Sequence, residues 1–157
     1  MRIYLAGFFD TRARMRPIRD RIWALGHEVV STWLDEVKHP ETMDTETFYK
    51  KLALRDRAEI RSADLIIVDT IDETPRGGRE VELGFALGRF QGIEIWTVGP
   101  MRNVFHRLAD EIFDDWDTAF LALGAPEARV VADATYDEAM TEYGKRMSWL
   151  EQPVYND

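Results

Sequence analysis

One carboxylate stands out by its position in the sequence. Glu82 lies in the segment ADLIIVDTIDETPRGGREVELGFALG, in which an apolar strand pattern leads into a glycine-rich turn and then a helix beginning near Gly78. At one turn into this helix, Glu82 should be kept ionised at neutral pH by the helix dipole. An ionised carboxylate can attack an electrophilic carbon and form a covalent intermediate. The simpler alternative is that Glu82 is an ordinary first-turn helix glutamate.

Strand and helix patterns alternate along the chain. Apolar, β-prone segments predict strands at 2–8, 27–33, 64–70 and 93–99. Helical spacing of apolar residues predicts helices near 13–25, 44–62, 79–90 and 114–123, and the last stretch is expected to add a strand and an amphipathic helix near 136–150. This order predicts an α/β fold with a doubly wound, mostly parallel, five-stranded sheet of the flavodoxin or Rossmann kind, with helices on both faces. Ligands of such sheets bind at the carboxyl ends of strands, which directs attention to the loops after Gly7, Trp33 and Asp69.

Composition limits the domain count and the partners. A chain of 157 residues with 45% hydrophobic content can bury one core, so we expect one domain over 1–125 with an extension, 126–157, packed on it. The net charge of −9 argues against nucleic acid and membrane partners. The sequence has no cysteine, which fits a reducing compartment, and we expect a cytoplasmic protein. The apolar start of the chain is too short for a signal segment and predicts a strand.

Three short motifs follow one another over residues 3–100. The first is IYLAG, residues 3–7, which runs into an aromatic loop beginning at Phe8. The second is an aspartate, Asp56, on the helix before a strand that opens with Ala-Asp. The third is Gly78, followed four residues later by an E-x-G-x-A pattern that begins at Glu82. In this order and spacing the motifs resemble the nucleoside 2-deoxyribosyltransferase family.

The resemblance implies catalytic roles for three residues. Glu82 is similar to the family's nucleophile, which displaces the base and forms a covalent glycosyl-enzyme intermediate. Asp56 is similar to the residue that moves protons to and from the base, and Tyr4 to the tyrosine whose hydroxyl orients the nucleophile. The chemistry is that of a retaining glycosidase, with one carboxylate near C1′ and an acid for the leaving group. A second base as acceptor gives sugar transfer, and water gives hydrolysis.

The resemblance also implies the partners and the substrate pocket. The expected ligands are a nucleoside or nucleotide and a free nucleobase, with no metal and no organic cofactor, because carboxylates alone can perform both steps. Family members can complete their pockets with residues of a neighbouring subunit, so a homodimer or larger homo-oligomer is expected. The residues expected to bind substrate are Ala6, Gly7, Phe8, Asp69, Arg76, Gly78 and Asn103.

Several of these residues have simpler explanations. Asp56 lies in the charged run RDRAEIR and could belong to a solvated salt-bridge face of a helix. Tyr4 on an apolar strand could be a core residue. His106 is expected to be structural, because the three histidines are scattered and show no metal-ligand spacing.

The loop before the helix departs from the transferase pattern. Arg76 stands about where the transferases carry an acidic residue, next to Gly77 and Gly78. Backbone N–H groups at a helix start and a guanidinium together suit a phosphate, so a nucleoside 5′-monophosphate N-glycosidase is a second hypothesis. The serine-bearing phosphate loop of that hydrolase branch is not evident, and Arg12 and Arg76 could also be surface arginines. A non-catalytic nucleotide-binding module, or another flavodoxin-like protein, is the alternative outside the enzymes.

Overall fold

The computed structural model describes residues 1–36, 42–72, 77–88 and 92–124. The chain divides into two compact units, Met1–Phe120 and Leu121–Asp157, and almost all described residues belong to the first. The expected extension 126–157, with its strand and helix, lies outside the described residues and stays a prediction. Within the described part of the chain, no helix has the length and apolar character needed to cross a membrane.

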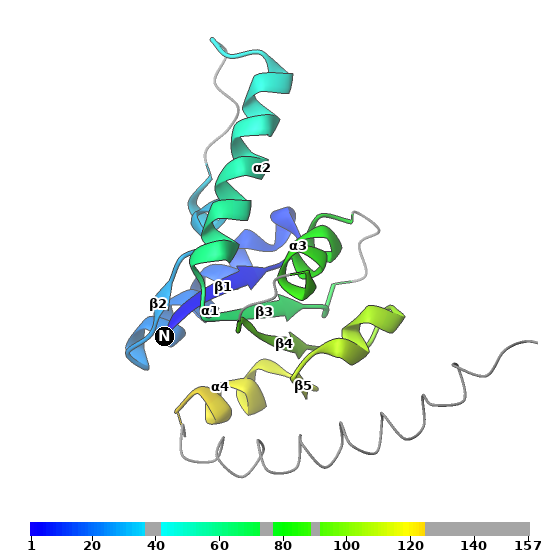
Figure 1. Ribbon diagram of the computed structural model, residues 1–157. Coiled ribbons are helices and arrows are strands. Elements are labelled where there is room, and N and C mark those ends of the chain that lie inside the picture. The colour runs from blue at the N-terminus through cyan, green and yellow to red at the C-terminus, as the bar shows by residue number, and fades with distance from the viewer. Residues whose placement is uncertain (37–41, 73–76, 89–91, 125–157) are drawn as a thin grey trace, which may run out of the picture. The chain divides into compact units, whose positions relative to one another are not determined.

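The first unit is built on a parallel sheet of five strands (Figure 1). The strands lie in the order β2-β1-β3-β4-β5, and each neighbouring pair is parallel. Their bounds are β1 Arg2–Ala6, β2 Glu28–Val29, β3 Leu65–Asp69, β4 Glu94–Val98 and β5 Glu111–Phe113. This is the flavodoxin-like order, in which the chain adds strands first on one side of β1 and then on the other. The predicted fold class is therefore confirmed.

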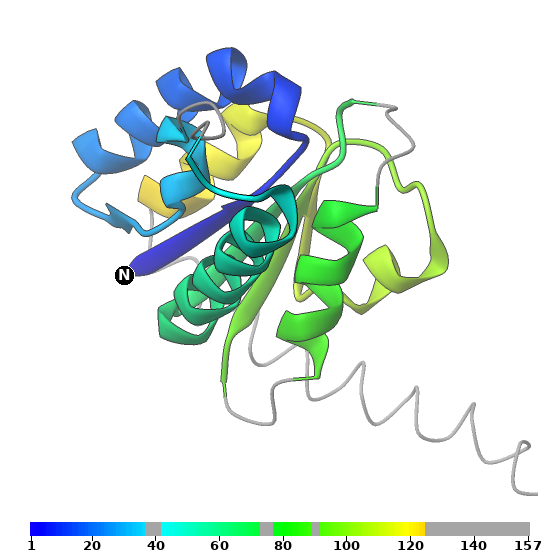
Figure 2. The same cartoon turned by 90° about the horizontal axis from the view of Figure 1, so that it is seen from above.

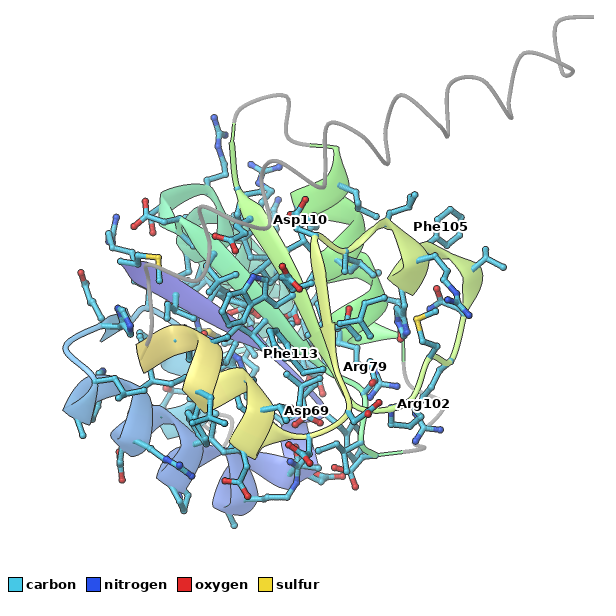
Figure 3. All side chains as sticks on the ribbon, turned by 90° about the horizontal axis from the view of Figure 1, so that it is seen from below. Asp69, Arg79, Arg102, Phe105, Asp110 and Phe113 are labelled. Atoms are coloured by element: carbon cyan, nitrogen blue, oxygen red, sulfur yellow. The ribbon has the colours of Figure 1, made fainter. Side chains whose placement is uncertain are left out.

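Helices cover both faces of the sheet (Figure 2). The bounds are α1 Arg12–Ala24, α2 Thr45–Ser62, α3 Gly78–Leu87 and α4 Trp116–Gly124, with short 3₁₀ helices η1 Phe9–Thr11, η2 Thr32–Asp35 and η3 Val104–Leu108. Helices α2 and α3 pack on one face, and α1 and the first turn of α4 on the other (Figures 2 and 3). Helix α2 begins where the Asp44 side chain accepts a 2.8 Å hydrogen bond from the N–H of Thr47, an N-cap that satisfies a free helix donor.

The two central strands, β1 and β3, form the middle of the core. All five residues of β3 are buried, and four of the five in β1 are buried, because helices cover both sides of this part of the sheet. Each buried leucine or isoleucine contributes about 1.5–3 kcal/mol to folding. Tyr4 pairs in register with Ile66 and has no exposed surface, so the backbone that carries this tyrosine is fixed on both sides.

The second strand is shorter than the sequence predicts. Residues 27–33 were expected to be extended, but β2 ends at Val29 and η2 begins at Thr32. The ladder stops because the N–H of Leu5 donates to the side-chain Oγ of Ser31 instead of to a backbone carbonyl. The Glu59 carboxylate then accepts from the N–H and the hydroxyl of Thr32 and fixes the start of η2.

The fifth strand comes from a segment that was not predicted to be a strand. Residues 111–113 pair with residues 96–98 of β4 and form the edge of the sheet. Periodicity gives little signal over three residues, and Ile112 on this strand is 42% exposed. The contacts that hold the strand are tertiary: the Asp110 carboxylate accepts from the N–H of Ile95, and Gly99 donates to the carbonyl of Phe113.

Candidate active site

A cavity of about 240 Å³ lies at the carboxyl end of β1. In a sheet of this order the connections turn in opposite directions on either side of β1, so ligands bind at the crevice between β1 and β3. The loop after β1, η2, α2 and α3 all contribute side chains. The lining residues are Gly7, Phe8, Phe9, Trp33, Asp56, Gly78, Arg79 and Glu82.

Glu82 and Tyr4 are joined by a hydrogen bond. The hydroxyl of Tyr4 donates to Oε1 of Glu82 at 2.8 Å, so a side chain from the rigid core of the sheet holds one carboxylate oxygen. The other oxygen, Oε2, is shielded from solvent and has no hydrogen-bond partner among the described residues. Buried polar atoms in folded proteins are nearly always paired. Because Glu82 lines the cavity, Oε2 is the oxygen that a bound molecule can engage.

The environment of Glu82 favours its protonated form. The pKa of Glu82 is raised to about 8. Burial is the largest cause, the hydrogen bond from Tyr4 acts against it, and the negative charges of Asp56 and Glu59 act with it. The prediction that the helix dipole keeps Glu82 ionised at neutral pH is therefore wrong, because desolvation outweighs the dipole. Burial and the Glu82 carboxylate also raise the pKa of Tyr4 well above its usual range, so Tyr4 remains a donor.

Asp56 faces the same cavity from helix α2. Its Oδ1 accepts two hydrogen bonds from Arg55, from Nε at 3.1 Å and from Nη2 at 2.9 Å. Burial raises the pKa of Asp56, whereas the hydrogen bonds and charge of Arg55 lower it, and the nearby charge of Glu36 raises it. Asp56 is therefore ion-paired with Arg55 and also lines the cavity, and its role in moving protons stays a prediction.

Aromatic side chains form another wall of the cavity. Phe8, Phe9 and Trp33 line it. The indole Nε1 of Trp33 donates to the carbonyl of Leu5 at 2.7 Å, which anchors η2 against β1. The guanidinium of Arg12 lies 3.7 Å from the centre of the Phe9 ring, a cation–π contact. Flat aromatic surfaces of this kind suit a planar heteroaromatic ligand.

Asp69, predicted to bind substrate, is held by contacts within the protein. Arg14 donates to its two carboxylate oxygens at 2.9 and 2.8 Å, and the indole of Trp116 donates at 2.7 Å. Asp69 is not among the lining residues of the cavity, whereas Arg79, which was not predicted, is. Figure 3 shows both residues with Arg102 at the same end of the sheet. Nη1 of Arg79 donates to the backbone carbonyls of Asp69 and Asp72 at 3.1 and 3.0 Å.

Asn103 belongs to a separate polar cluster around Glu80. Nδ2 of Asn103 donates to Oε2 of Glu80 at 2.7 Å, and the completely buried His106 contacts the same oxygen at 2.9 Å. Nδ1 of His106 accepts from the N–H of Arg102, so Nε2 carries the proton and donates to Glu80. These are the contacts of a structural histidine, as expected. Asn103 does not line the cavity, and its contribution to a neighbouring subunit's pocket stays a prediction.

The remaining predicted residues divide into three groups. Gly7, Phe8 and Gly78 line the cavity. Ala6 is completely buried at the end of β1 and is not a lining residue. Arg76 lies outside the described residues. Among the residues that the structure describes, no group of three or more His, Asp and Glu side chains is arranged to hold a metal ion.

Four residues of the site were not singled out from the sequence. Phe9, Trp33 and Arg79 line the cavity, and Arg55 binds Asp56. A signal existed for Arg79, which precedes Glu82 by three positions and so lies on the same face of α3. Trp33 ends the predicted strand 27–33, and the loop after this strand was expected to take part in ligand binding. Phe9 follows the predicted Phe8 directly, but its position depends on η1, a short helix without a sequence pattern of its own.

Comparisons with known proteins place the fold. The sequence matches no protein-family model and no curated protein. Among solved structures, a 2-deoxyribosyltransferase from Bacillus psychrosaccharolyticus is similar with a TM-score of 0.60 and 24% identity, covering 76% of this chain and 90% of that one. A conserved protein from Enterococcus faecalis V583 is similar with a TM-score of 0.63 and 14% identity, covering 78% and 96%. The predicted resemblance to the deoxyribosyltransferases is thus confirmed at the level of the fold.

A third solved structure is a CMP N-glycosidase from Clostridium botulinum. It has a TM-score of 0.49 and 18% identity, and the match covers 78% of this chain and 98% of the other.

Proposed function

We propose that this chain is an enzyme that cleaves the N-glycosidic bond of a nucleoside and transfers the sugar, a 2′-deoxyribose, to another base. The observation that carries the proposal is the pair of carboxyl groups in one cavity, Glu82 and Asp56. Tyr4 holds Oε1 of Glu82, and Oε2 has no partner in the part of the chain that the structure describes. The likeness of fold to a 2-deoxyribosyltransferase supports the same chemistry.

In the first step, Oε2 of Glu82 attacks C1′ of the sugar. A C1′–O bond forms while the C1′–N bond breaks, and the bonding electron pair leaves with the base. A proton must reach the departing nitrogen, and Asp56 is placed at the same cavity to deliver it. Tyr4 keeps the carboxylate in one orientation, so that the remaining oxygen points to one place. The product of this step is a glycosyl ester of Glu82.

In the second step, a nitrogen of the incoming base attacks C1′. The ester bond breaks and its electron pair returns to Glu82 as the carboxylate, while the incoming nitrogen gives its proton to Asp56. Water in place of the base gives the free sugar. Stacking of both bases on Phe8, Phe9 or Trp33 would hold leaving and entering groups in the same orientation.

The two carboxyl groups need one proton between them. The raised pKa of Glu82, about 8, indicates that this proton resides on Glu82 in the folded protein at neutral pH. Catalysis requires it on Asp56 or on the leaving base, and two coupled carboxyls titrate as a pair. Positive charge that develops on the sugar in the transition state favours the ionised Glu82 and so drives the proton in that direction.

A nucleoside 5′-monophosphate as substrate is the second candidate, favoured by Arg79. This buried arginine lines the cavity beside Gly78, at the start of helix α3. An arginine together with backbone N–H groups of a helix start suits a phosphate. Isothermal titration with a nucleoside and its monophosphate distinguishes the candidates, because failure of the phosphate to strengthen binding argues against the second.

Activity is tested with a panel of deoxynucleosides, with and without a free acceptor base, followed by chromatography. Glu82→Gln should reduce turnover by at least about a thousandfold, because the nucleophile is lost. Glu46→Gln, an exposed glutamate of α2, is the matched control and should retain full activity. New nucleoside formed only with Glu82 intact supports transfer, and release of free base without exchange moves the assignment to hydrolysis. No turnover with nucleosides or monophosphates argues for a binding module.

A further inference from the structure

Arg55 is the centre of a group of acidic side chains next to the cavity. Besides Oδ1 of Asp56, it contacts Oε2 of Glu36, which follows η2, and Oε1 of Glu59 at 3.9 Å. The side chains of Arg55, Glu36, Asp56 and Glu59 are 30%, 10%, 22% and 13% exposed, so solvent screens their interactions only in part. One guanidinium therefore faces three carboxylates that come from two separate segments.

Arg55 contacts Asp56 through two of its three guanidinium nitrogens, and both bind the same carboxylate oxygen. Nε and Nη2 both bind Oδ1 of Asp56, while Nη1 binds Glu36. Oδ2 of Asp56 has no hydrogen bond to any described residue, and Asp56 lines the cavity. The fork of the guanidinium thus fixes the Asp56 carboxyl group through Oδ1, and Oδ2 is not used by this contact.

Arg55 also connects the site to η2. Two arginines contact Glu36, the residue that follows η2. Arg55 binds its carboxylate, and Nη1 of Arg12 donates to its backbone carbonyl at 3.0 Å. Trp33 of η2 lines the cavity. Asp56 on α2 and Trp33 on η2 are consequently connected through the ion pair of Arg55 with Glu36, the residue that follows η2.

We propose that Arg55 is a positioning residue that fixes the Asp56 carboxyl group in one orientation and offsets the negative charges around it. This inference rests on the proposed function, in which Asp56 must be able to take the single proton from Glu82 and pass it to the base. Arg55 on the same helix and Glu36 after η2 act on Asp56, and the charge of Asp56 acts in turn on Glu59 of α2, Glu82 of α3 and Tyr4 of β1. Without Arg55 no cation among the described residues contacts Asp56, and the negative charge of Glu36 then acts on it unopposed.

The test compares Arg55→Met and Arg55→Lys with Arg57→Met, an exposed arginine of the same helix as matched control. The first readout is the pH profile of kcat/KM. Arg55→Met should move the acidic limb to higher pH and lower kcat/KM there by roughly tenfold, because a neighbouring cation lowers a carboxyl pKa by about one unit or more. Arg55→Lys keeps the charge without the two-point contact, so the limb should stay in place while kcat falls. Arg57→Met should change neither.

The second readout does not depend on activity. The carboxyl carbon of Asp56 is titrated by NMR in the wild-type protein and in each variant, with circular dichroism to establish that the variants fold. An upward displacement of the Asp56 titration in Arg55→Met, absent in Arg57→Met and in Arg55→Lys, supports the role of Arg55 even if no nucleoside proves to be a substrate. An unchanged Asp56 titration in folded Arg55→Met overturns it, whatever the activity assays give.

Discussion

Replacement of Glu82 by glutamine should stabilise the protein at alkaline pH. In the unfolded chain a glutamate releases its proton near the ordinary pKa of 4.5, and in the folded protein burial raises the pKa of Glu82 to about 8. Between these two pH values the folded state holds more protons than the unfolded state, so stability falls as pH rises. At about 1.4 kcal/mol per pH unit, the interval corresponds to about 5 kcal/mol that is present below pH 4.5 and lost above pH 8.

The assay is urea unfolding of the wild-type protein and Glu82→Gln at pH 5, 7 and 9. All other titrating groups are shared, so the difference between the two free energies of unfolding reports Glu82 together with its interactions with Asp56 and Glu59. We expect this difference to change in favour of Glu82→Gln by about 3 kcal/mol between pH 5 and pH 7, and by about 1 kcal/mol more at pH 9. Glu46→Gln, on the exposed face of α2, controls for the loss of a negative charge and should show a difference that is nearly the same at each pH.

A constant difference between the wild-type protein and Glu82→Gln from pH 5 to pH 9 would refute this reasoning. It would mean that Glu82 is already ionised in the folded protein, as a helix-dipole argument alone predicts. A difference that grows in favour of the wild-type protein with rising pH would mean that the folded state stabilises the carboxylate, and Arg79, the arginine that lines the cavity with Glu82, would be the first group to replace in testing why.

Three further predictions follow from the same contacts. The kcat/KM of the wild-type enzyme should fall tenfold per pH unit above about pH 8, because the carboxyl pair then loses the single proton that the leaving base needs. A kcat/KM that stays constant up to pH 10 would show that the leaving base does not receive its proton from this pair. Tyr4→Phe should lower kcat by roughly ten- to a hundredfold, because a hydrogen bond to a charged group contributes about 1.5–3 kcal/mol. Tyr49→Phe, at a tyrosine that is 63% exposed, is the control and should leave kcat unchanged. Equal kcat values for both variants would leave Tyr4 without a role. Asp69→Asn should lower the free energy of unfolding in urea by about 1.5–3 kcal/mol, because the buried side chain loses its charge-assisted hydrogen bonds with Arg14, which keeps its contact with Asp72; an unchanged free energy would contradict that.

The fold was predictable because its elements carry strong local patterns. Strand β3 begins with four consecutive apolar residues, as expected of a strand covered on both faces. Helix α1 repeats its buried residues Met15, Ile18 and Ile22 at helical spacing. The exceptions are segments held by tertiary contacts. Strand β2 ends where Ser31 binds the backbone of β1, and β5 is a three-residue edge strand. Neither contact can be derived from the neighbouring residues in the sequence.

The candidate site was predictable where it depends on position along a strand or helix. Tyr4, Gly7, Asp56, Gly78 and Glu82 were expected at the site because their motifs resemble those of the deoxyribosyltransferases. The structure brings all five to the cavity, four as lining residues and Tyr4 through its hydroxyl. What could not be predicted is which of several charged residues pair with one another. The direction in which Asp69 points is decided by Arg14 and Trp116, which are 55 and 47 positions away in the chain.

The charge state of Glu82 shows why position along a helix is not enough to assign a role. A helix dipole favours a negative charge in the first turn by about 0.3–1 kcal/mol, and by about 2 kcal/mol in partly buried sites. Burial and the nearby charges of Asp56 and Glu59 disfavour the ionised form by about 5 kcal/mol, which corresponds to the rise of the pKa from 4.5 to about 8. The larger effect prevails, so the start of α3 positions Glu82 while the cavity determines its charge. A carboxylate that is poorly solvated is also more basic, and it regains stabilisation only when a positive charge forms beside it, as happens on a sugar ring whose bond to the base is breaking.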